Sequence, residues 1–289
     1  MSNFFKTKKM KTVKLFFICI IVCSASIMYV GCKKETNPVP NPTIPISPMN
    51  QAGKVALENA SIQGAFADAF QQVDLVIHQN GLRSTHSSVI ITITPNDLTT
   101  YPKDVVIDFG TSNTGSDGVV RSGQILAHLT APYIDSGSVT TISFNDYHVN
   151  NRLITGTETI NNAGKNSVGH YVFDVIILNG NLYSPDGVTV YNSHQQREWI
   201  VGDNTLLDLM DDVYLVTGTG SGTTTDNVNY TLNITEALQV AIACAWVESG
   251  KVDITEPNIP VITLDYGNGN CDDQAIATCG GYTYAITMQ

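Results

Sequence analysis

The stretch Tyr230-Thr231-Leu232-Asn233-Ile234-Thr235 decides the fold, because apolar and polar side chains alternate in it at every step. Successive side chains of a β-strand point to opposite faces of a sheet, so the alternation predicts a strand with one buried and one solvated face. Comparable runs, bounded by turn residues, recur from residue 88 to the C-terminus. They read VIITITP, DVVIDFG, GQILAHLT, VTTISFND, HYVFDVIIL, VTVYNS, VYLVTGT, NYTLNIT, KVDIT and PVITLDYG.

These runs are spaced like the strands of an antiparallel sheet, since no pattern of helical length separates them. The sequence therefore predicts a mainly β fold, a large antiparallel meander or sandwich. One amphipathic helix is expected before it, over residues 55–77, where apolar residues recur at steps of three and four and Asn80-Gly81 marks the end. Such a helix is expected to cover one face or one end of the sheet.

Two short patterns occur twice in the β region. Leu153-Ile154-Thr155-Gly156-Thr157 is echoed by residues 215–219, LVTGT, and Asp108-Phe109-Gly110 is echoed by Asp265-Tyr266-Gly267. A duplicated β unit explains both echoes, and so does ordinary strand and turn composition.

The charge balance restricts the partners of the chain. Its 289 residues include 15 Lys and Arg against 26 Asp and Glu, which gives a net charge of −11. Binding to a phosphate backbone requires clustered basic residues, so the composition argues against nucleic acid as a partner.

The N-terminal residues predict export. Residues 1–31 combine a stretch with five lysines and no acid with an apolar run from Leu15 to Val30, as in a lipoprotein signal peptide. Tyr29-Val30-Gly31-Cys32 resembles a bacterial lipobox, which implies that Cys32 carries lipid and anchors the chain to a membrane. A plain signal peptide and an uncleaved anchor are the alternatives. The resemblance favours the outer membrane, because Lys33 is not the Asp that retains lipoproteins in the inner membrane, and it favours the periplasmic face over the cell surface.

Residues 32–51 are expected to form a tether, because five of the eleven prolines lie within 33–50 and keep such a segment extended. Residues 52–289 are then expected to form a single β-rich domain that includes the helix.

Three cysteines remain after Cys32, in a setting that permits disulfides. We favour a bridge between Cys244, on an expected strand at 243–246, and Cys271, in the loop before the last hairpin. A bridge between Cys271 and Cys279 is the alternative, and either pairing leaves one thiol over.

Two sets of residues are candidates for ligand binding. Asp265, Asn268, Asn270 and Asp272 place oxygen ligands on a tight loop, which is chemistry that calcium accepts, although Asp, Asn and Gly also serve turns. Trp199 with Tyr191 and Arg197 can stack on a sugar ring if these side chains are exposed, and they form core and rim if they are buried. No other cofactor is indicated.

Signatures of catalysis are missing from the sequence. It has no G-x-S-x-G elbow, no P-loop and no H-E-x-x-H motif, and its six histidines show no ligand spacing. We therefore expect a protein that is not an enzyme, with an envelope hydrolase acting on glycans or peptides as the alternative.

Several motifs along the chain resemble those of a family of uncharacterised, β-rich lipoproteins of the Gram-negative outer membrane. The corresponding segments are Asp108–Thr111, Arg121–Ile125, Val149–Thr157, Arg197–Trp199, Cys244–Gly250 and Asp265–Asp272. The resemblance implies a β fold and an envelope location, and it implies no activity. The expected function is that of a lipid-anchored, non-catalytic binding or structural module, whose ligand would be a glycan or a peptide.

Overall fold

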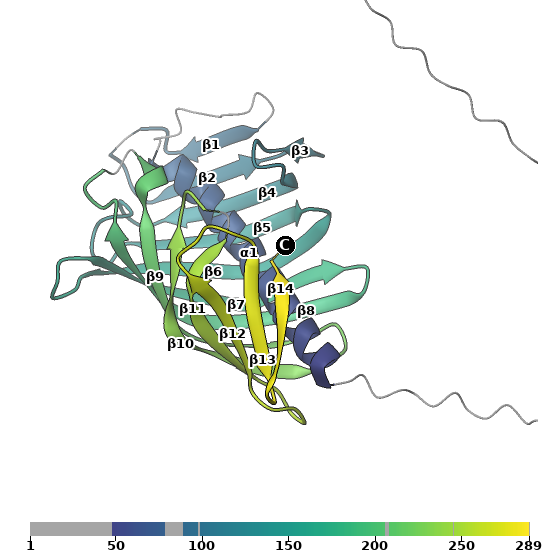
Figure 1. Cartoon of the computed structure of the whole chain (residues 1–289). Helices are drawn as coiled ribbons and strands as arrows, with labels where there is room; N and C mark the ends of the chain where they lie inside the picture. Colours follow the sequence, from purple (N-terminus) through teal and green to yellow (C-terminus); the bar gives the residue numbers. More distant parts are fainter. Residues whose placement is uncertain (1–47, 79–88, 98, 206–207, 245, 289) are drawn as a thin grey trace, which may run out of the picture. The chain divides into compact units, whose positions relative to one another are not determined.

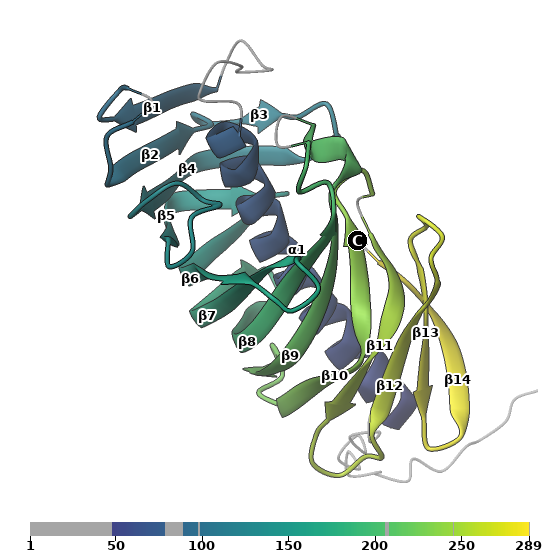
Figure 2. The same ribbon diagram turned by 90° about the vertical axis from the view of Figure 1, so that its left-hand side faces the viewer.

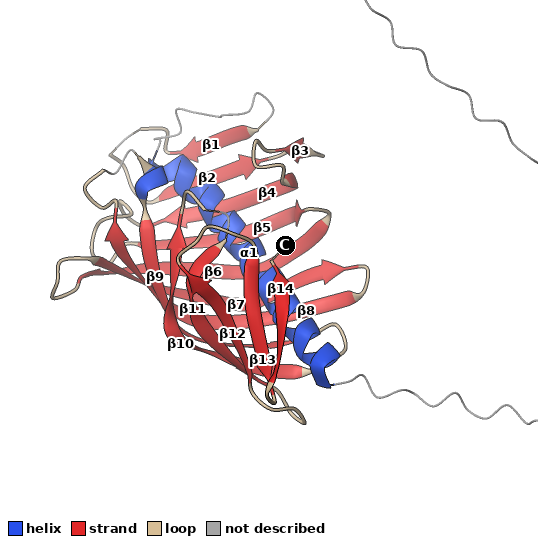
Figure 3. Cartoon of the chain, in the orientation of Figure 1, coloured by secondary structure: helices blue, strands red, loops and turns tan. Residues whose placement is uncertain are grey.

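One antiparallel sheet contains all strands of the computed structural model, which describes residues 48–78, 89–97, 99–205, 208–244 and 246–288 (Figures 1 and 3). These residues belong to one compact unit, Pro45–Gln289. The elements are α1 (Pro48–His78), β1 (Ile90–Thr94), β2 (Lys103–Asp108), β3 (Asn113–Thr114), β4 (Val120–Leu129), β5 (Val139–Val149), β6 (Arg152–Lys165), β7 (Tyr171–Ser184), β8 (Gly187–Val201), the 3-10 helix η1 (Leu209–Asp211), β9 (Val213–Thr223), β10 (Asn229–Ala241), β11 (Val247–Thr255), β12 (Ile262–Asn268), β13 (Gln274–Cys279) and β14 (Tyr282–Thr287).

The strands follow one another in chain order from β1 to β14, and each pairs with its neighbours in sequence. Only the two-residue β3 departs from this path, because it pairs with β4 beside β2. The predicted mainly β, antiparallel fold is confirmed, and of the two predicted forms the described residues show the meander. Among the described residues, β1 and β14 are the two edge strands of the sheet.

The sheet curls so that its two arms face each other across α1 (Figures 1 and 2). The helix contacts β4, β5, β7 and β8 on one arm and β12, β13 and β14 on the other. We call the face that meets α1 the inward face and the opposite face the outward face. The expectation that the helix covers one face of the sheet is therefore confirmed.

Small and large apolar side chains alternate along the buried side of α1. Four buried alanines let the helix approach the sheet closely, while Phe66 and Phe70 reach into it. The ring of Phe66 meets Phe144 of β5 edge to face, with centroids 5.7 Å apart. Opposite Phe66, β7 carries Gly180, where an added Cβ would lie 2.9 Å from the ring. The buried alanines are Ala52, Ala56, Ala65 and Ala69.

The helix is longer than predicted, because it begins at Pro48 rather than at residue 55. Proline is tolerated in the first turn of a helix, where its missing N–H has no intrahelical partner to lose. The last four residues of the predicted tether, 48–51, are therefore helical. The remainder of that tether, the signal peptide, Cys32 and the predicted stop at Asn80-Gly81 lie outside the described residues. No helix in the described part of the chain has the length and apolar character needed to cross a membrane.

None of the ten β-rich runs quoted from the sequence covers β3, β6, β13 or β14. In β6 the Gly, Thr and Asn residues resemble a turn, although the segment pairs with β5 and β7 over most of its length. The predicted strand at residues 243–246 is wrong. Cys244 lies in the turn between β10 and β11, and β11 begins at Val247.

The repeated Thr-Gly-Thr segments both lie in strands, and their glycines sit where the sheet bends. Gly156 of β6 has φ = 119° and Gly218 of β9 has φ = 129°, a region that favours glycine. An added Cβ on Gly156 would lie 2.7 Å from the carbonyl oxygen of Asn179, and one on Gly218 would run into that of His194. Each glycine lets a neighbouring backbone approach, so the echo reflects a shared bend.

The second echo reflects a shared turn. Asp108 and Asp265 each accept a hydrogen bond from the backbone N–H two residues later, at 2.7 Å from Gly110 and 2.9 Å from Gly267. The aromatic residue between them, Phe109 or Tyr266, is buried in each case.

Replacing Gly218 with Ala tests the role of the bend. The substitution is expected to lower the free energy of unfolding by at least about 2 kcal/mol, because the new methyl group meets a neighbouring backbone at an unfavourable φ. Gly64→Ala is the control: Gly64 lies on the exposed side of α1 with open space around it, and the change should raise stability by roughly 0.5–1 kcal/mol. Urea denaturation measures both, and a neutral Gly218→Ala would contradict this account of the bend.

Candidate functional site

Trp199 and Tyr191 lie on the inward face of β8 and are fully buried. The indole N–H of Trp199 donates to Asp212 at 3.1 Å, and its ring stacks on Tyr214 with centroids 5.8 Å apart. Burial raises the pKa of the Tyr191 phenol. The structure therefore matches the buried alternative for these aromatic residues, in which they form core rather than a sugar-stacking platform.

Arg197 also points inward from β8, between the helix and the sheet. Its guanidinium bonds the carboxylate of Glu158 at 3.0 Å and lies 4.7 Å from the centroid of the Phe70 ring of α1. Glu158 is fully buried, and burial raises the pKa of its carboxyl, while the positive charge of Arg197 opposes that rise. The predicted ligand-binding set is thus brought together, but as part of the packing around α1.

A second arginine, which is buried, connects the helix to β4. Arg121 of β4 donates to both carboxylate oxygens of Asp68 on α1, and it also pairs with Asp117 in the loop before β4. The hydroxyl of Tyr147 donates to the same Asp68 carboxylate at 2.8 Å. The side chains of Arg121 and Asp68 are 4% and 12% exposed, so this pair is shielded from water, whereas Asp117 is 45% exposed.

The predicted calcium residues lie at the end of β12 and in the loop that follows it. The Asp265 carboxylate accepts from the N–H of Gly267 and lies 3.7 Å from Lys251, while Asp272 accepts from the N–H of Gln274 at 2.9 Å. Asn268 and Asn270 are exposed. Both carboxylates therefore hold turns of their own loop, which is the alternative use of such residues.

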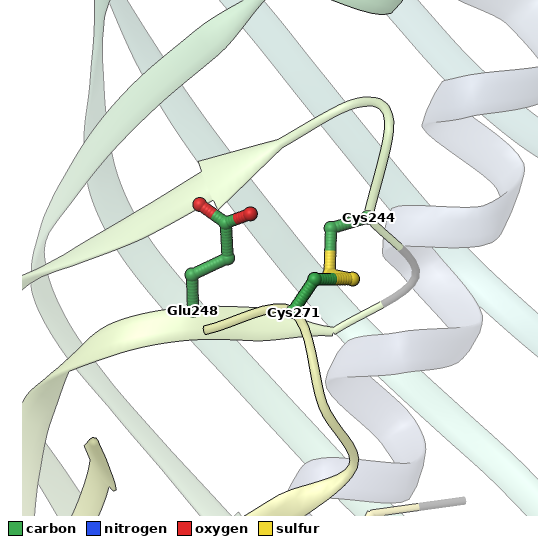
Figure 4. A group of neighbouring side chains, drawn as sticks. All are labelled: Cys244, Glu248 and Cys271. Carbon is green, nitrogen blue, oxygen red and sulfur yellow. A yellow bond between two sulfur atoms is a disulfide. The ribbon is translucent and has the colours of Figure 1, made fainter. Parts of the chain in front are cut away.

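The predicted bridge between Cys244 and Cys271 is present, with the sulfur atoms 2.06 Å apart, and Cys279 is a buried free thiol. The two sulfurs and the carboxylate of Glu248 lie within 4.8 Å of one another (Figure 4). In the described part of the chain this is the single group of three or more His, Cys, Asp or Glu ligand atoms that close together. Because its sulfurs are bonded to each other, we interpret it as a cross-link between the β10–β11 turn and the loop after β12.

The outward face carries a regular array of short polar side chains that sequence reasoning did not locate. The strand register places one residue of each strand from β4 to β14 in a continuous row across the sheet, and every residue in this row except Ile176 is polar. The row is His128, Thr141, Thr159, Ile176, His194, Thr219, Asn233, Asp253, Thr263, Thr278 and Thr283. Alternation within single strands indicated a solvated face, but the alignment depends on bulges that the sequence does not reveal.

A shallow depression of about 520 Å³ interrupts this face over β9, β10 and β11. Asp253 supplies its only carboxylate among the described lining residues, and that group accepts a hydrogen bond from Thr263 at 2.7 Å. The same lining includes no Lys, Arg or His. Such a surface can hydrogen-bond a polar ligand that is not anionic. The lining residues are Thr219, Gly220, Thr231, Leu232, Asn233, Asp253, Thr255 and Val261.

Fold and site together define a curled, single-sheet β protein with an internal helix and a polar outward face. Comparison of the chain with models of protein families, with curated proteins and with solved structures gives no significant match.

Removing the guanidinium of Arg121 tests the buried cluster. Arg121→Met keeps an apolar stem but leaves Asp68 buried without its cation, so we expect the free energy of unfolding to fall by about 3 kcal/mol. Lys251→Met removes a positive charge from the solvent-exposed pairs with Glu236 and Asp265 and should cost much less stability than Arg121→Met. Equal losses in the two variants, measured by urea denaturation, would show that the Arg121 cluster does not hold the helix.

Proposed function

We propose that the protein is a lipid-anchored protein of the cell envelope that acts as a non-catalytic binding module. The proposed binding role rests on the difference between the two faces of the sheet. The inward face packs on α1, and its Trp, Tyr and Arg side chains serve that packing. The outward face presents a row of Thr, Asn, Asp and His side chains together with the depression.

A glycan or a polar peptide is the proposed ligand. Threonine, asparagine and aspartate offer hydrogen-bond donors and acceptors at the spacing of the strands, and both kinds of ligand present hydroxyl, amide or carbonyl groups. The net charge of −11 and the carboxylate of Asp253, the single one among the described lining residues of the depression, disfavour anionic ligands.

The N-terminal sequence is what supports the proposed lipid anchor. A basic stretch, an apolar run and the lipobox-like residues up to Cys32 support it, and the Pro-rich segment after Cys32 suits a spacer between membrane and domain. We propose the periplasmic face of the outer membrane as the location, by the resemblance described above.

The anchor is tested by replacing Cys32 with Ser. The wild-type chain should partition with membranes, and the intact mass of its mature form should correspond to a chain that begins at a lipid-modified Cys32. Cys32→Ser should abolish the modification and release the domain or leave it unprocessed. A wild-type mature chain without lipid would contradict the anchor.

Binding is tested with glycan and peptide arrays. The purified chain should retain a subset of uncharged glycans or peptides, and Asn233→Ala should weaken that binding at least tenfold, since Asn233 lies exposed in the depression. Asn145→Ala, which removes an exposed amide from the same face on β5, is the matched control and should bind normally.

The same glycans and peptides distinguish a binding module from the alternative, an envelope hydrolase that acts on glycans or peptides. Incubation should leave them intact, as judged by mass spectrometry. Release of cleaved products would favour the hydrolase, and binding that Asn233→Ala does not change would exclude the depression as the site.

A further inference from the structure

The last sixteen residues, Gln274 to Gln289, carry no charged side chain, although the chain has 41 Asp, Glu, Lys and Arg residues in all. Residues 274–287 form the hairpin of β13 and β14, and β14 is the last strand in the order of the sheet. The uncharged segment therefore coincides with one of the two edge strands of the described sheet.

An edge strand presents unpaired backbone groups. In an antiparallel pair every second residue of β14 directs its N–H and C=O away from β13, where they are available to another strand. Soluble proteins usually guard such edges with lysine, proline, a bulge or a covering element. Tyr282-Thr283-Tyr284-Ala285-Ile286-Thr287 contains neither charge nor proline, and its pairing with β13 has no register shift.

Buried side chains anchor β14 to the core, while its outward-facing side chains are exposed to solvent. Ile286 and Met288 are buried in the core, and the N–H of Met288 donates to the carbonyl of Asp273 at 2.8 Å. On the outward face Ala285 is exposed and lies opposite Ile276, which is 51% exposed. Tyr282, at the start of the strand, is 67% exposed. A strand added beside β14 would pair the backbone and lie next to the exposed Ala285.

We infer that β14 is a docking edge for a second copy of this chain, through antiparallel pairing of β14 with β14 about a two-fold axis. Antiparallel self-pairing places residues of the same face opposite each other, so Thr283, Ala285 and Thr287 of one copy meet the same three residues of the other. Because β14 carries no charged side chain, pairing of the two strands brings no like charges of β14 together, which matters for a chain with a net charge of −11.

The opposite edge is less suited to the same role. On the outward face β1 lies beside Asp104 and Asp108 of β2, which pair in register with Thr94 and Ile90. Copies joined from β1 to β14 would also continue into an open chain, whereas pairing of β14 with itself closes as a dimer.

The inference is tested by the mass of the purified full chain in mild detergent, by light scattering after size exclusion over a range of concentrations. We expect a dimer that dissociates on dilution. Ala285→Lys should give a monomer at every concentration, because it puts a charge on the exposed edge without touching the core. Thr92→Lys adds the same charge to the exposed outward side of β1 and should leave the dimer intact. Circular dichroism checks that both variants keep their strand content.

Three results would overturn the inference. The first is a monomeric wild-type chain at the highest concentration reached, and the second is a dimer that survives Ala285→Lys. The third is a series of assemblies larger than the dimer that Thr92→Lys abolishes, because these require the β1 edge.

Discussion

The packing of α1 against the inward face of the sheet is the interaction on which the rest of the structure depends. The helix is buried along most of its length and contacts both arms of the curled sheet. Without it, the apolar side chains of β4 to β8 and of β12 to β14 would face water, and a sheet of this size with an uncovered apolar face is prone to association. Neither element buries its apolar surface alone.

Polar contacts fix the position of α1 along its own axis between the two arms of the sheet. Near its start Glu58 accepts hydrogen bonds from Thr189 and Thr225, at 3.0 and 2.7 Å, and further along Asp68 meets Arg121 and Tyr147. Burial raises the pKa of the Tyr147 phenol, and the nearby Asp68 carboxylate raises it further, so the hydroxyl remains a proton donor. Apolar packing is tolerant of small shifts, and these directional bonds remove that tolerance.

The inward face serves packing and the outward face is left for partners, which explains why the candidate residues that are conspicuous in the sequence are not those on the exposed surface. Trp199, Tyr191 and Arg197 attract notice in the sequence because large aromatic and basic side chains often bind ligands. Here they lie beside Glu158, Asp212 and Phe70 as part of the core. The surface left for partners consists of threonine and asparagine, which are inconspicuous one at a time and gain significance through their alignment across strands.

The sequence predicts the fold class well, because alternation in runs such as Tyr230–Thr235 is a direct consequence of strand geometry. It also predicts the pairing of Cys244 with Cys271 and the presence of one N-terminal helix. It fails for β6, whose Gly156 and Gly164 resemble turn residues but lie where the strand bends. It also leaves open which face of β8 is buried, since alternation gives the period of a pattern and not its direction.

Hydrogen exchange, followed by mass spectrometry on the full chain, tests most directly whether helix and sheet form one cooperative unit. The amides of α1 between Ala52 and Val76 and those of β7 and β8 should exchange slowly and at the same free energy of opening. Much faster exchange in α1 than in β7 and β8 would contradict the account, because it would show that the sheet stays folded while the helix detaches from its inward face.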